Sequence, residues 1–334
     1  MLIFSKEEIK QYIQLNHSSI LVIEEGFTYL NNNHVKMPPI MRVDIEENNG
    51  EVDVKSAYIK GKDMFAIKIS SGFFNNYKLG LPSGNGMMIL INTKTGVPES
   101  ILLDNGYLTD IRTACAGAIA AKYLSRENIK TVGVIGSGSQ ARYQLQALKL
   151  VRNFKKVLVY SRSKERVEAY ANEMSQKLGV EIKITNSAEE VVKNSDTVIT
   201  TTPSNEPIIK SEWLHPGLHI TAMGSDAETK QELEASVFKV ADKVVCDTIQ
   251  QCARLGELHH AIDEGIIQDQ STILELGQLT SSQKVGREHN NEITVCDLTG
   301  TGVQDTAIAL YAYQELVKKS MGIRVHDKSL TIKK

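Results

Sequence analysis

Four charged side chains stand beside apolar runs, where local structure does not require them. They are Arg42 after PPIM, Lys68 within FAIKI, Arg112 before a run of small apolar residues, and Asp226 after HITAMG. Such a charge is either paired or used by the protein, because burying an unpaired charge is costly. Three cations and one carboxylate suit a small amino acid, whose α-carboxylate needs cations and whose amino or imino group needs a carboxylate. A single residue of this kind more often has a structural role. The interpretation therefore depends on all four residues together.

A glycine-rich segment forms a second candidate site. The letters GSGSQA, a G-x-G-x-x-A pattern, lie between the apolar strand TVGVI and a segment with helical periodicity. Gly136 permits a tight turn, Gly138 leaves room for a pyrophosphate, and Ala141 lets the helix pack closely on the strand. The helix N-terminus at Ser139 and Gln140 then offers N–H groups and a positive dipole to phosphate. The pattern predicts a dinucleotide cofactor, and a glycine turn without a ligand is the alternative.

The residues after the second strand of this region bear on the choice of cofactor. The strand KVLVY is followed by Ser161 and Arg162, where an enzyme that uses NAD usually has an acidic residue for the ribose 2′-hydroxyl. A hydroxyl and a guanidinium suit a 2′-phosphate instead. NADP(H) is therefore favoured over NAD(H), with a solvated surface role for Arg162 as the alternative. Thr201 and Thr202, at the end of a later strand, are expected to line the cofactor crevice.

Two different patterns of elements must position these residues. From Lys130 onward, short apolar strands alternate with helices, which predicts a doubly wound parallel α/β sheet of the Rossmann type. The first ~30 residues look helical, with Ser5 and Glu8 in a capping-box pattern. MPPIMRVDI, EVDVKSAYI, MFAIKIS and a hairpin around NTKTG then predict an antiparallel sheet. The amphipathic helix DTAIALYAYQELVKKSMG is expected to pack back on this sheet, and the tail HDKSLTIKK to be loose.

Composition argues against several other classes of protein. The chain of 334 residues has a formal net charge of -2, so it lacks the basic excess typical of nucleic-acid binding. No apolar run approaches the ~18 residues of a membrane span, and MLIFSKEEIKQYIQ turns polar too early for a signal peptide. We therefore expect a cytoplasmic protein that engages neither membranes nor nucleic acid. Its four scattered cysteines predict free thiols, and no metal site is predicted.

Longer segments resemble the ornithine cyclodeaminase/mu-crystallin family. They are MPPIMRVDI, FAIKIS, LTDIRTACAGAIAAKYL, VIGSGSQAR, AMGSDAETKQEL, LGELHHAI and TGTGVQDTAIA, which together run from near residue 37 to near residue 310. Within the family, the resemblance is greatest to the ectoine-utilisation cyclodeaminase-like branch, in the segments GEVDVK, FAIKISSGFF, LLDNGYLTD and LTGTGVQDTAIA. The family fold implies a homodimer built through the N-terminal domain. We accordingly predict a substrate-binding and dimerisation domain at 1–113 and 304–334, and a Rossmann NAD(P)-binding domain at 114–303.

The resemblance implies a role for each matching position. It implies that Arg42, Lys68 and Arg112 hold the substrate carboxylate and that Lys68 also lies near the reacting amine or imine. It makes Asp226 the catalytic acid/base beside the nicotinamide, and Ser83 a hydroxyl near cofactor and substrate. The other implied cofactor contacts are Arg112, Thr113 beside the pyrophosphate, Met223, Gly224 and Ser225 along the nicotinamide, and Thr299 and Gly300 on its far side.

Two departures concern the substrate. Ornithine cyclodeaminases carry an acidic residue after the second Rossmann strand, and a Cys-Pro-Gly-like turn after the aspartate. Here the first position is Ser161-Arg162 and the second is Ala227-Glu228-Thr229. The predicted function is therefore NAD(P)-dependent hydride transfer at the α-carbon of a small amino acid or its imine. Cyclodeaminase, amino-acid dehydrogenase and imine reductase activities all fit, with ectoine degradation as one context.

Two functions of other classes are the alternatives. An NADP(H)-binding, mu-crystallin-like protein with little turnover would keep the glycine turn, but the charged set argues for catalysis. A hydroxy-acid or sugar dehydrogenase would need a histidine base or a Tyr-x-x-x-Lys pair. Tyr160 and Lys164 match only in spacing, and His259 with His260 reads as a polar pair at a helix start.

Overall fold

The computed structural model describes residues 1–325, whose contacts divide them into two compact units. Unit 1 comprises residues 1–14, 21–112 and the described residues from 301 onward, and unit 2 comprises 15–20 and 113–300. The predicted loose tail HDKSLTIKK lies outside the described residues. Within the described range, no helix combines the length and apolar character that crossing a bilayer requires.

Unit 2 is built on an eight-stranded sheet in which all neighbouring strands are parallel. In chain order its strands are β8 (Thr131–Ile135), β9 (Lys156–Tyr160), β10 (Glu181–Ile184), β11 (Thr197–Thr200), β13 (His219–Ala222), β15 (Lys243–Cys246), β16 (Leu274–Glu275) and β17 (Thr294–Asp297). A separate pair, β12 (Asn205–Ile209) and β14 (Gln231–Leu233), forms a small parallel sheet.

Two separate apolar clusters pack against the large sheet and show that it is doubly wound. The first draws on helices α3 (Tyr107–Leu124), α4 (Ser139–Val151) and α5 (Lys164–Leu178). The second draws on α6 (Ala188–Lys193), α7 (Val237–Val240), α8 (Ile249–Leu255) and α9 (Glu257–Asp263), and the short α10 (Leu276–Thr280) follows β16. The strands are continuous apolar runs such as TVGVI because both faces are covered. The predicted Rossmann-type fold is confirmed.

The strand order of the large sheet determines where a ligand can bind. The order is β10-β9-β8-β11-β13-β17-β15-β16, so the chain reverses direction across the sheet between β8 and β11. Ligands of open α/β sheets bind beyond the carboxyl ends of the strands at such a switch point. Gly136 follows β8, Thr201 follows β11 and Met223 follows β13, so all three lie at that edge.

Unit 1 contains a mixed sheet rather than the antiparallel sheet predicted from the sequence. Its strand order is β18-β1-β7-β6-β5-β4-β2, with β3 also paired to β4. The strands are β1 (Leu2–Ser5), β2 (Val35–Lys36), β3 (Met41–Ile45), β4 (Gly50–Ile59), β5 (Met64–Phe73), β6 (Gly84–Asn92), β7 (Pro98–Leu103) and β18 (Ile323–Arg324). Strand β1 runs parallel to β7, whereas the other pairs are antiparallel. The sequence prediction placed the short apolar segment LIF in a helix, because the strands that pair with it lie far away in the sequence.

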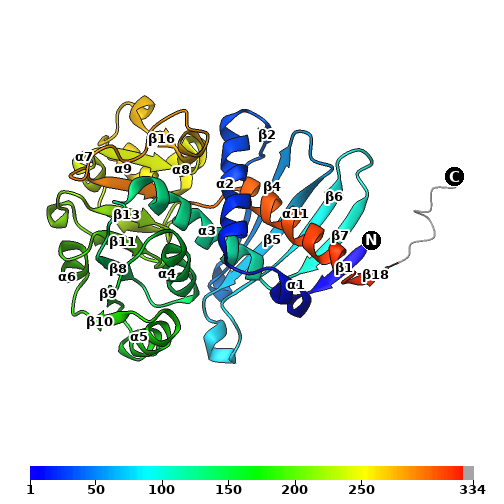
Figure 1. Cartoon of the computed structure of the whole chain (residues 1–334), viewed down its shortest axis with the longest axis horizontal. Coiled ribbons are helices and arrows are strands. Elements are labelled where there is room, and N and C mark those ends of the chain that lie inside the picture. Colours follow the sequence, from blue (N-terminus) through cyan, green and yellow to red (C-terminus); the bar gives the residue numbers. More distant parts are fainter. Residues whose placement is uncertain (326–334) are drawn as a thin grey trace. The chain divides into compact units, whose positions relative to one another are not determined.

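Two helices of unit 1, the first and the last, begin at capping boxes. The predicted capping box at Ser5 and Glu8 is confirmed and starts α1 (Lys6–Tyr12), which α2 (His17–Asn31) follows. Thr301 and Gln304 form a second capping box at the start of α11 (Gly302–Lys318), with Thr301 N donating to Gln304 Oε1 at 2.7 Å. Helix α11 packs across β4 and β5, as predicted for the C-terminal helix (Figure 1).

Helix α11 approaches β4 very closely at its first turn. A Cβ atom on Gly302 would overlap the backbone of Ser56 on β4, so only glycine allows this approach. Thr306, one turn further along, donates through its hydroxyl to the carbonyl of Ala57 at 2.8 Å and accepts from Ala66 N at 3.1 Å. The first turn of α11 is thereby fixed against both central strands.

Candidate active site

The glycine turn of unit 2 has the shape that a pyrophosphate requires. Gly136 has a φ of +117°, and a Cβ atom there would lie 2.5 Å from Thr201 Oγ1. Gly138 is the N-cap of the 13-residue helix α4, no side chain caps that helix end, and a Cβ atom there would meet nothing within 4 Å. Open space therefore adjoins an exposed helix N-terminus, which suits a phosphate group.

Two further residues are tied to this turn. The Oγ atoms of Ser137 and Ser161 lie 2.9 Å apart, so the predicted ribose-side serine adjoins the turn, and the neighbouring Arg162 is exposed. Arg142 donates from Nη1 to the carbonyls of Ser137 at 2.6 Å and Gly138 at 3.1 Å. Arg142 holds the loop in place, and its position directly after the GSGSQA motif was the signal that could have identified it.

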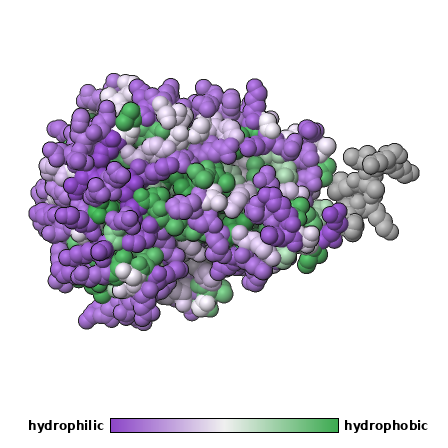
Figure 2. All heavy atoms as spheres, viewed as in Figure 1, coloured by the Kyte–Doolittle hydropathy of each residue, from purple (hydrophilic) through white to green (hydrophobic). Residues whose placement is uncertain are grey.

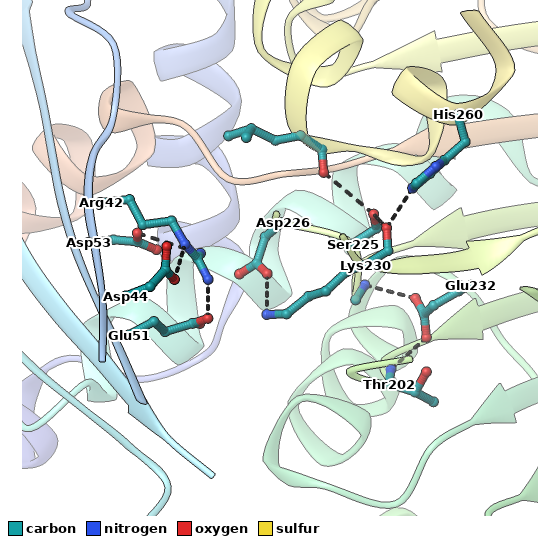
Figure 3. A network of polar contacts seen from close by, with 12 residues as sticks. Arg42, Asp44, Glu51, Asp53, Thr202, Ser225, Asp226, Lys230, Glu232 and His260 are labelled. Carbon is teal, nitrogen blue, oxygen red and sulfur yellow. Dashed lines mark hydrogen bonds and ion pairs between the residues drawn. The ribbon is translucent and has the colours of Figure 1, made fainter. Parts of the chain in front are cut away.

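Asp226, predicted as the acid/base, follows β13 and is paired with a lysine. Lys230 Nζ lies 2.7 Å from Asp226 Oδ1, and the two side chains are 11% and 36% exposed respectively (Figure 3). The Lys230 carbonyl accepts from Ser225 Oγ at 2.6 Å and lies 2.9 Å from His260 Nε2. This turn places the Asp226 carboxylate beside the Lys230 ammonium group. Sequence reasoning missed Lys230, although its i+4 spacing from Asp226 could have revealed it.

Of the other predicted cofactor contacts of unit 2, Thr113 lies in α3, whereas Thr299 and Gly300 lie between β17 and α11. The carbonyl of Thr113 accepts from Gln144 Nε2 at 2.9 Å. The N–H groups of Thr299 and Gly300 both donate to the buried Asp247 carboxylate, at 2.9 Å and 2.7 Å from its Oδ2. Backbone groups at these positions are therefore held by side chains of the same unit.

In unit 1, two of the predicted cations share one carboxylate. Lys68 Nζ on β5 lies 3.0 Å from Asp305 Oδ2, and Arg112 Nε on α3 lies 2.9 Å from Asp305 Oδ1. The side chains of Lys68, Arg112 and Asp305 are 2%, 6% and 0% exposed. We call these three residues the cationic cluster, because two cations face a single carboxylate. Sequence reasoning missed Asp305, whose signal was a lone acid in the apolar helix segment GVQDTAIAL.

Burial and mutual charge shift the pKa values within the cationic cluster. Burial, together with the charge of Arg112, lowers the pKa of Lys68 from 10.5 to about 7, although Asp305 opposes this shift. Burial alone would raise the pKa of Asp305, but the charges of Lys68 and Arg112 lower it below its usual value. Asp305 is therefore ionised at neutral pH, and Lys68 is close to the midpoint of its titration.

Arg42 lies in a cluster of the opposite character. On β3, its guanidinium lies 2.9 Å from Asp44 Oδ1 and 3.7 Å from Asp53 Oδ1, and it also pairs with Glu51 (Figure 3). These charges raise the pKa of Arg42 in spite of its partial burial. We call Arg42 and these three acids the acidic cluster, because one cation faces three carboxylates.

The ion pairs do not bring all the predicted substrate-binding residues together. Lys68 and Arg112 meet at Asp305, whereas Arg42 contacts only acids of β3 and β4 in the ion pairs of the described residues. Ser83 is exposed between β5 and β6, where its carbonyl accepts from Phe73 N at 2.8 Å. In the described part of the chain, no group of three or more His, Cys, Asp or Glu side chains is arranged to hold a metal ion.

Comparison with known proteins identifies relatives along almost the whole length. The family described as ornithine cyclodeaminase/mu-crystallin matches residues 1–320. A protein of Rhizobium meliloti (strain 1021) named as a dehydrogenase is 48% identical over 313 residues, which cover 94% of this chain and 95% of that protein.

Solved structures agree with this result. The Δ1-pyrroline-2-carboxylate reductase of Thermococcus litoralis, in complex with NADH and L-proline, has a TM-score of 0.92 and 33% identity and covers 97% of this chain and 100% of its own. An archaeal alanine dehydrogenase dimer with bound NAD has a TM-score of 0.90 and 32% identity, with coverage of 98% and 99%.

Proposed function

The chain belongs to the ornithine cyclodeaminase/mu-crystallin family, and from that premise we propose that it transfers hydride to or from the α-carbon of a small amino acid or its imine. The predicted family and the predicted enzyme class, an NAD(P)-dependent amino- or imino-acid oxidoreductase, are confirmed. The assignment to the ectoine-utilisation branch stays a prediction.

The observation that carries this proposal is the excess of buried positive charge in the cationic cluster. Lys68 and Arg112 share one carboxylate and are almost completely buried. A buried charge that lacks a counter-charge is expensive. The α-carboxylate of an amino or imino acid would supply the missing negative charge, and a substrate without a carboxylate would not. Lys68 and Arg112 are therefore the proposed carboxylate ligands. Arg42 is left out of this pair because three acids already pair with it, and Ser83 stays a prediction.

The residues of unit 2 fit a nicotinamide cofactor. When bound, this cofactor accepts or supplies the hydride. We assign the N-terminus of α4, from Gly138 to Gln140, to the pyrophosphate, because that helix end is exposed and its N-cap is glycine. Ser161 and Arg162 are assigned to a 2′-phosphate, so NADP(H) is favoured and NAD(H) is the alternative. The structural relatives bind NADH and NAD, which supports the alternative that this chain uses NAD(H).

Substitution of Arg162 tests the choice of cofactor. Arg162→Ala should weaken NADPH binding about tenfold or more, because it removes a charge-assisted bond to phosphate. NADH has no 2′-phosphate, so its dissociation constant should stay within about twofold. Fluorescence titration of both cofactors measures this ratio, and equal losses would refute the 2′-phosphate assignment.

Asp226 is the proposed acid/base of the chemical step. In the oxidative direction its carboxylate would accept a proton from the substrate amine as hydride leaves the α-carbon, and in the reductive direction it would return that proton. Lys230 Nζ, 2.7 Å from Asp226 Oδ1, pairs with this carboxylate. The imine so formed can be hydrolysed, can be attacked by a second amine of the substrate, or can itself be the substrate in reverse.

We also propose that the two predicted domains have separate roles and that the protein is a homodimer. Residues 114–303 would bind the cofactor, and residues 1–113 with 304–334 would bind substrate and a second copy. Two observations support the dimer: an archaeal relative is one, and unit 1 exposes apolar side chains, among them Met41, Tyr77, Leu79 and Leu81. Figure 2 shows hydrophobic residues among hydrophilic ones on the face that it draws. Four buried free thiols suit the proposed cytoplasmic location.

One assay separates the proposed reactions. Purified protein is incubated with NADP⁺ or NAD⁺ and a panel of small L-amino acids that includes dibasic ones, while ammonia and nicotinamide absorbance are followed together. Ammonia without net cofactor reduction indicates cyclodeamination, and ammonia matched by reduction indicates a dehydrogenase. When NADPH or NADH and a cyclic imine are supplied instead, oxidation of the cofactor indicates a reductase. Cofactor binding without turnover on any substrate would instead support the mu-crystallin-like alternative.

A further inference from the structure

Glu232 is a fully buried carboxylate that joins two loops of unit 2. It lies on β14, and its Oε2 accepts from Thr200 Oγ1 at 2.6 Å and from Gly224 N at 2.9 Å. Its Oε1 accepts from Thr202 N at 2.5 Å (Figure 3). Thr200 ends β11 and Gly224 follows β13, so one side chain connects the carboxyl ends of two neighbouring parallel strands.

The two loops that Glu232 connects carry proposed cofactor contacts. Thr201 and Thr202 belong to the first loop, and Met223 to Ser225 belong to the second. The loops touch each other closely, because a Cβ atom on Gly224 would lie 2.5 Å from Glu232 Oε2 and would also overlap the Thr202 carbonyl. A small change at Glu232 would therefore displace both loops.

The first loop also contacts the glycine turn. A Cβ atom on Gly136 would lie 2.5 Å from Thr201 Oγ1. Glu232 thus fixes the backbone on either side of the position assigned to the nicotinamide, whereas the turn at Gly136 and Gly138 and the helix α4 hold the pyrophosphate side. The two parts of the proposed cofactor site therefore have different hydrogen-bond supports, and Thr201 is the point at which they touch.

A second buried carboxylate holds Glu232 in place. Glu257 on α9 accepts from Glu232 N at 2.8 Å and from Leu233 N at 2.9 Å. Burial of the Glu232 carboxylate is costly and raises its pKa to about 6, against the opposing effect of its hydrogen bonds. Costly local arrangements of this kind concentrate at functional sites. Three hydrogen-bond donors face the Glu232 side chain, and each needs an acceptor. A carboxylate provides these acceptors on both of its oxygen atoms.

We propose that Glu232 is a positioning residue that holds the β11 and β13 loops in the geometry that receives the nicotinamide half of the cofactor. This inference rests on the proposed function, because it requires that a nicotinamide cofactor binds at these loops. It adds a residue that contacts no reacting atom and acts through its hydrogen bonds with Thr200, Thr202 and Gly224.

The test is Glu232→Gln, with two ligands compared in the same protein. NADPH, or NADH if that binds more tightly, reports the whole cofactor site, and 2′,5′-ADP or ADP-ribose reports the half without nicotinamide. Glutamine places an NH₂ group against the backbone donors, so one loop must move. The dissociation constant of the nicotinamide cofactor should rise about tenfold or more, while that of the fragment stays within about twofold. Both are measured by titration calorimetry.

The matched control is Glu234→Gln, which makes the same change two residues further along. Glu234 accepts from Ser211 N at 2.9 Å and Ser211 Oγ at 3.0 Å, away from both loops. Its substitution should leave the ratio of the two dissociation constants unchanged. If Glu232→Gln does not fold, Thr200→Val removes a single donor from the carboxylate while keeping the shape of the strand residue. It should raise the same ratio by about threefold to tenfold.

Each outcome bears on a different claim. Wild-type protein that binds no nicotinamide cofactor would overturn the proposed function and this role with it. Wild-type binding with an unchanged ratio in Glu232→Gln, or in Thr200→Val where that variant replaces it, would overturn the role of Glu232 alone. Equal losses for both ligands would show that Glu232 supports only the fold of unit 2. A selective loss of the nicotinamide cofactor is the result that we expect.

Discussion

Two groups of charges in unit 1 differ in the sign of their excess. The cationic cluster is buried and has two cations to one carboxylate. The acidic cluster is partly exposed and has one cation to three carboxylates. An incoming carboxylate is attracted by the first and repelled by the second. The identity of a charged residue therefore says less about its role than the balance of the charges around it.

The two clusters also differ in burial, which increases the difference between their contributions to stability. A charge in contact with water is screened, and exposed ion pairs contribute about 0–1 kcal/mol to stability. A buried pair that loses one member leaves the other without compensation, which costs about 3–5 kcal/mol. Substitutions in the cationic cluster should therefore have large effects, and those in the acidic cluster small ones.

The largest effect on stability is expected for Asp305→Asn. This change leaves Lys68 and Arg112 buried without their shared counter-charge, so the free energy of unfolding should fall by about 3–5 kcal/mol. Chemical denaturation measures it. Glu315→Gln is the matched control, because Glu315 lies on the same helix and pairs with Lys318 at 2.7 Å on the surface. A loss below about 1 kcal/mol in Asp305→Asn would contradict the assigned ion pairs.

The next effect is on catalysis. Lys68→Met keeps an unbranched side chain that is one atom shorter, but removes a cation from the proposed carboxylate site. We expect kcat/KM for the amino or imino acid to fall by about 10²- to 10³-fold. Lys94→Met, at an 81% exposed position of the same unit, should leave it unchanged. A fall of less than about fivefold in Lys68→Met would place the substrate carboxylate elsewhere.

The pH dependence of KM sharpens the same comparison. The pKa of Lys68 is lowered to about 7, so the charge of Lys68 is lost as the pH rises through that value and KM should rise with it. A bound carboxylate opposes this loss, and the corresponding limb of kcat should lie at higher pH. The charged groups that influence Lys68 are Arg112, Asp305, Lys55 and Asp104, and burial raises the pKa of the last to about 6.

Lys68 should also make the free energy of unfolding depend on pH. Its pKa in the folded protein lies below the unfolded value, so the unfolded chain binds more protons between the two. The free energy of unfolding should therefore increase with pH above about 7 through this residue. Denaturation at several pH values checks the sign, and Lys68→Met should lack both this increase and the limb in KM. Identical pH profiles in wild type and variant would rule out Lys68 as the titrating group.

The smallest effect is expected for Arg42→Gln. Three acids already outweigh the charge of Arg42, and the side chain is 24% exposed. We expect kcat/KM to change by less than about fivefold and stability by less than about 1 kcal/mol. Steady-state kinetics beside Lys68→Met provides the comparison. A loss as large as that of Lys68→Met would show that Arg42 leaves its acids to bind the substrate.

Local sequence patterns predicted the parts of the molecule that local interactions form. The turn at Gly136 and the capping box at Ser5 each lie within six consecutive residues, and both could be identified without tertiary information. Strand β1 could not, because its partners β7 and β18 lie far along the chain.

The same reasoning explains what was missed in the candidate site. Asp305 meets Lys68 and Arg112 only after the chain has folded, and no spacing in the sequence relates these three positions. Glu232 looked like an ordinary acid of a polar segment, since its partners are backbone N–H groups and a hydroxyl of other strands. Residue type indicated where charge was unusual, but only the fold shows which charges meet.

The close contact between α11 and β4 has a consequence for the order of folding. The hydrogen bond from Ala66 N to Thr306 Oγ1 spans 240 residues, and all but a few residues of unit 2 lie between its two ends. During synthesis the strands of unit 1 emerge long before the helix that covers them, and contacts between distant segments form slowly. Unit 2 can therefore fold while the apolar surface of β4 and β5 still awaits its cover. The newly made chain acquires its cationic cluster last, when Asp305 arrives with that helix.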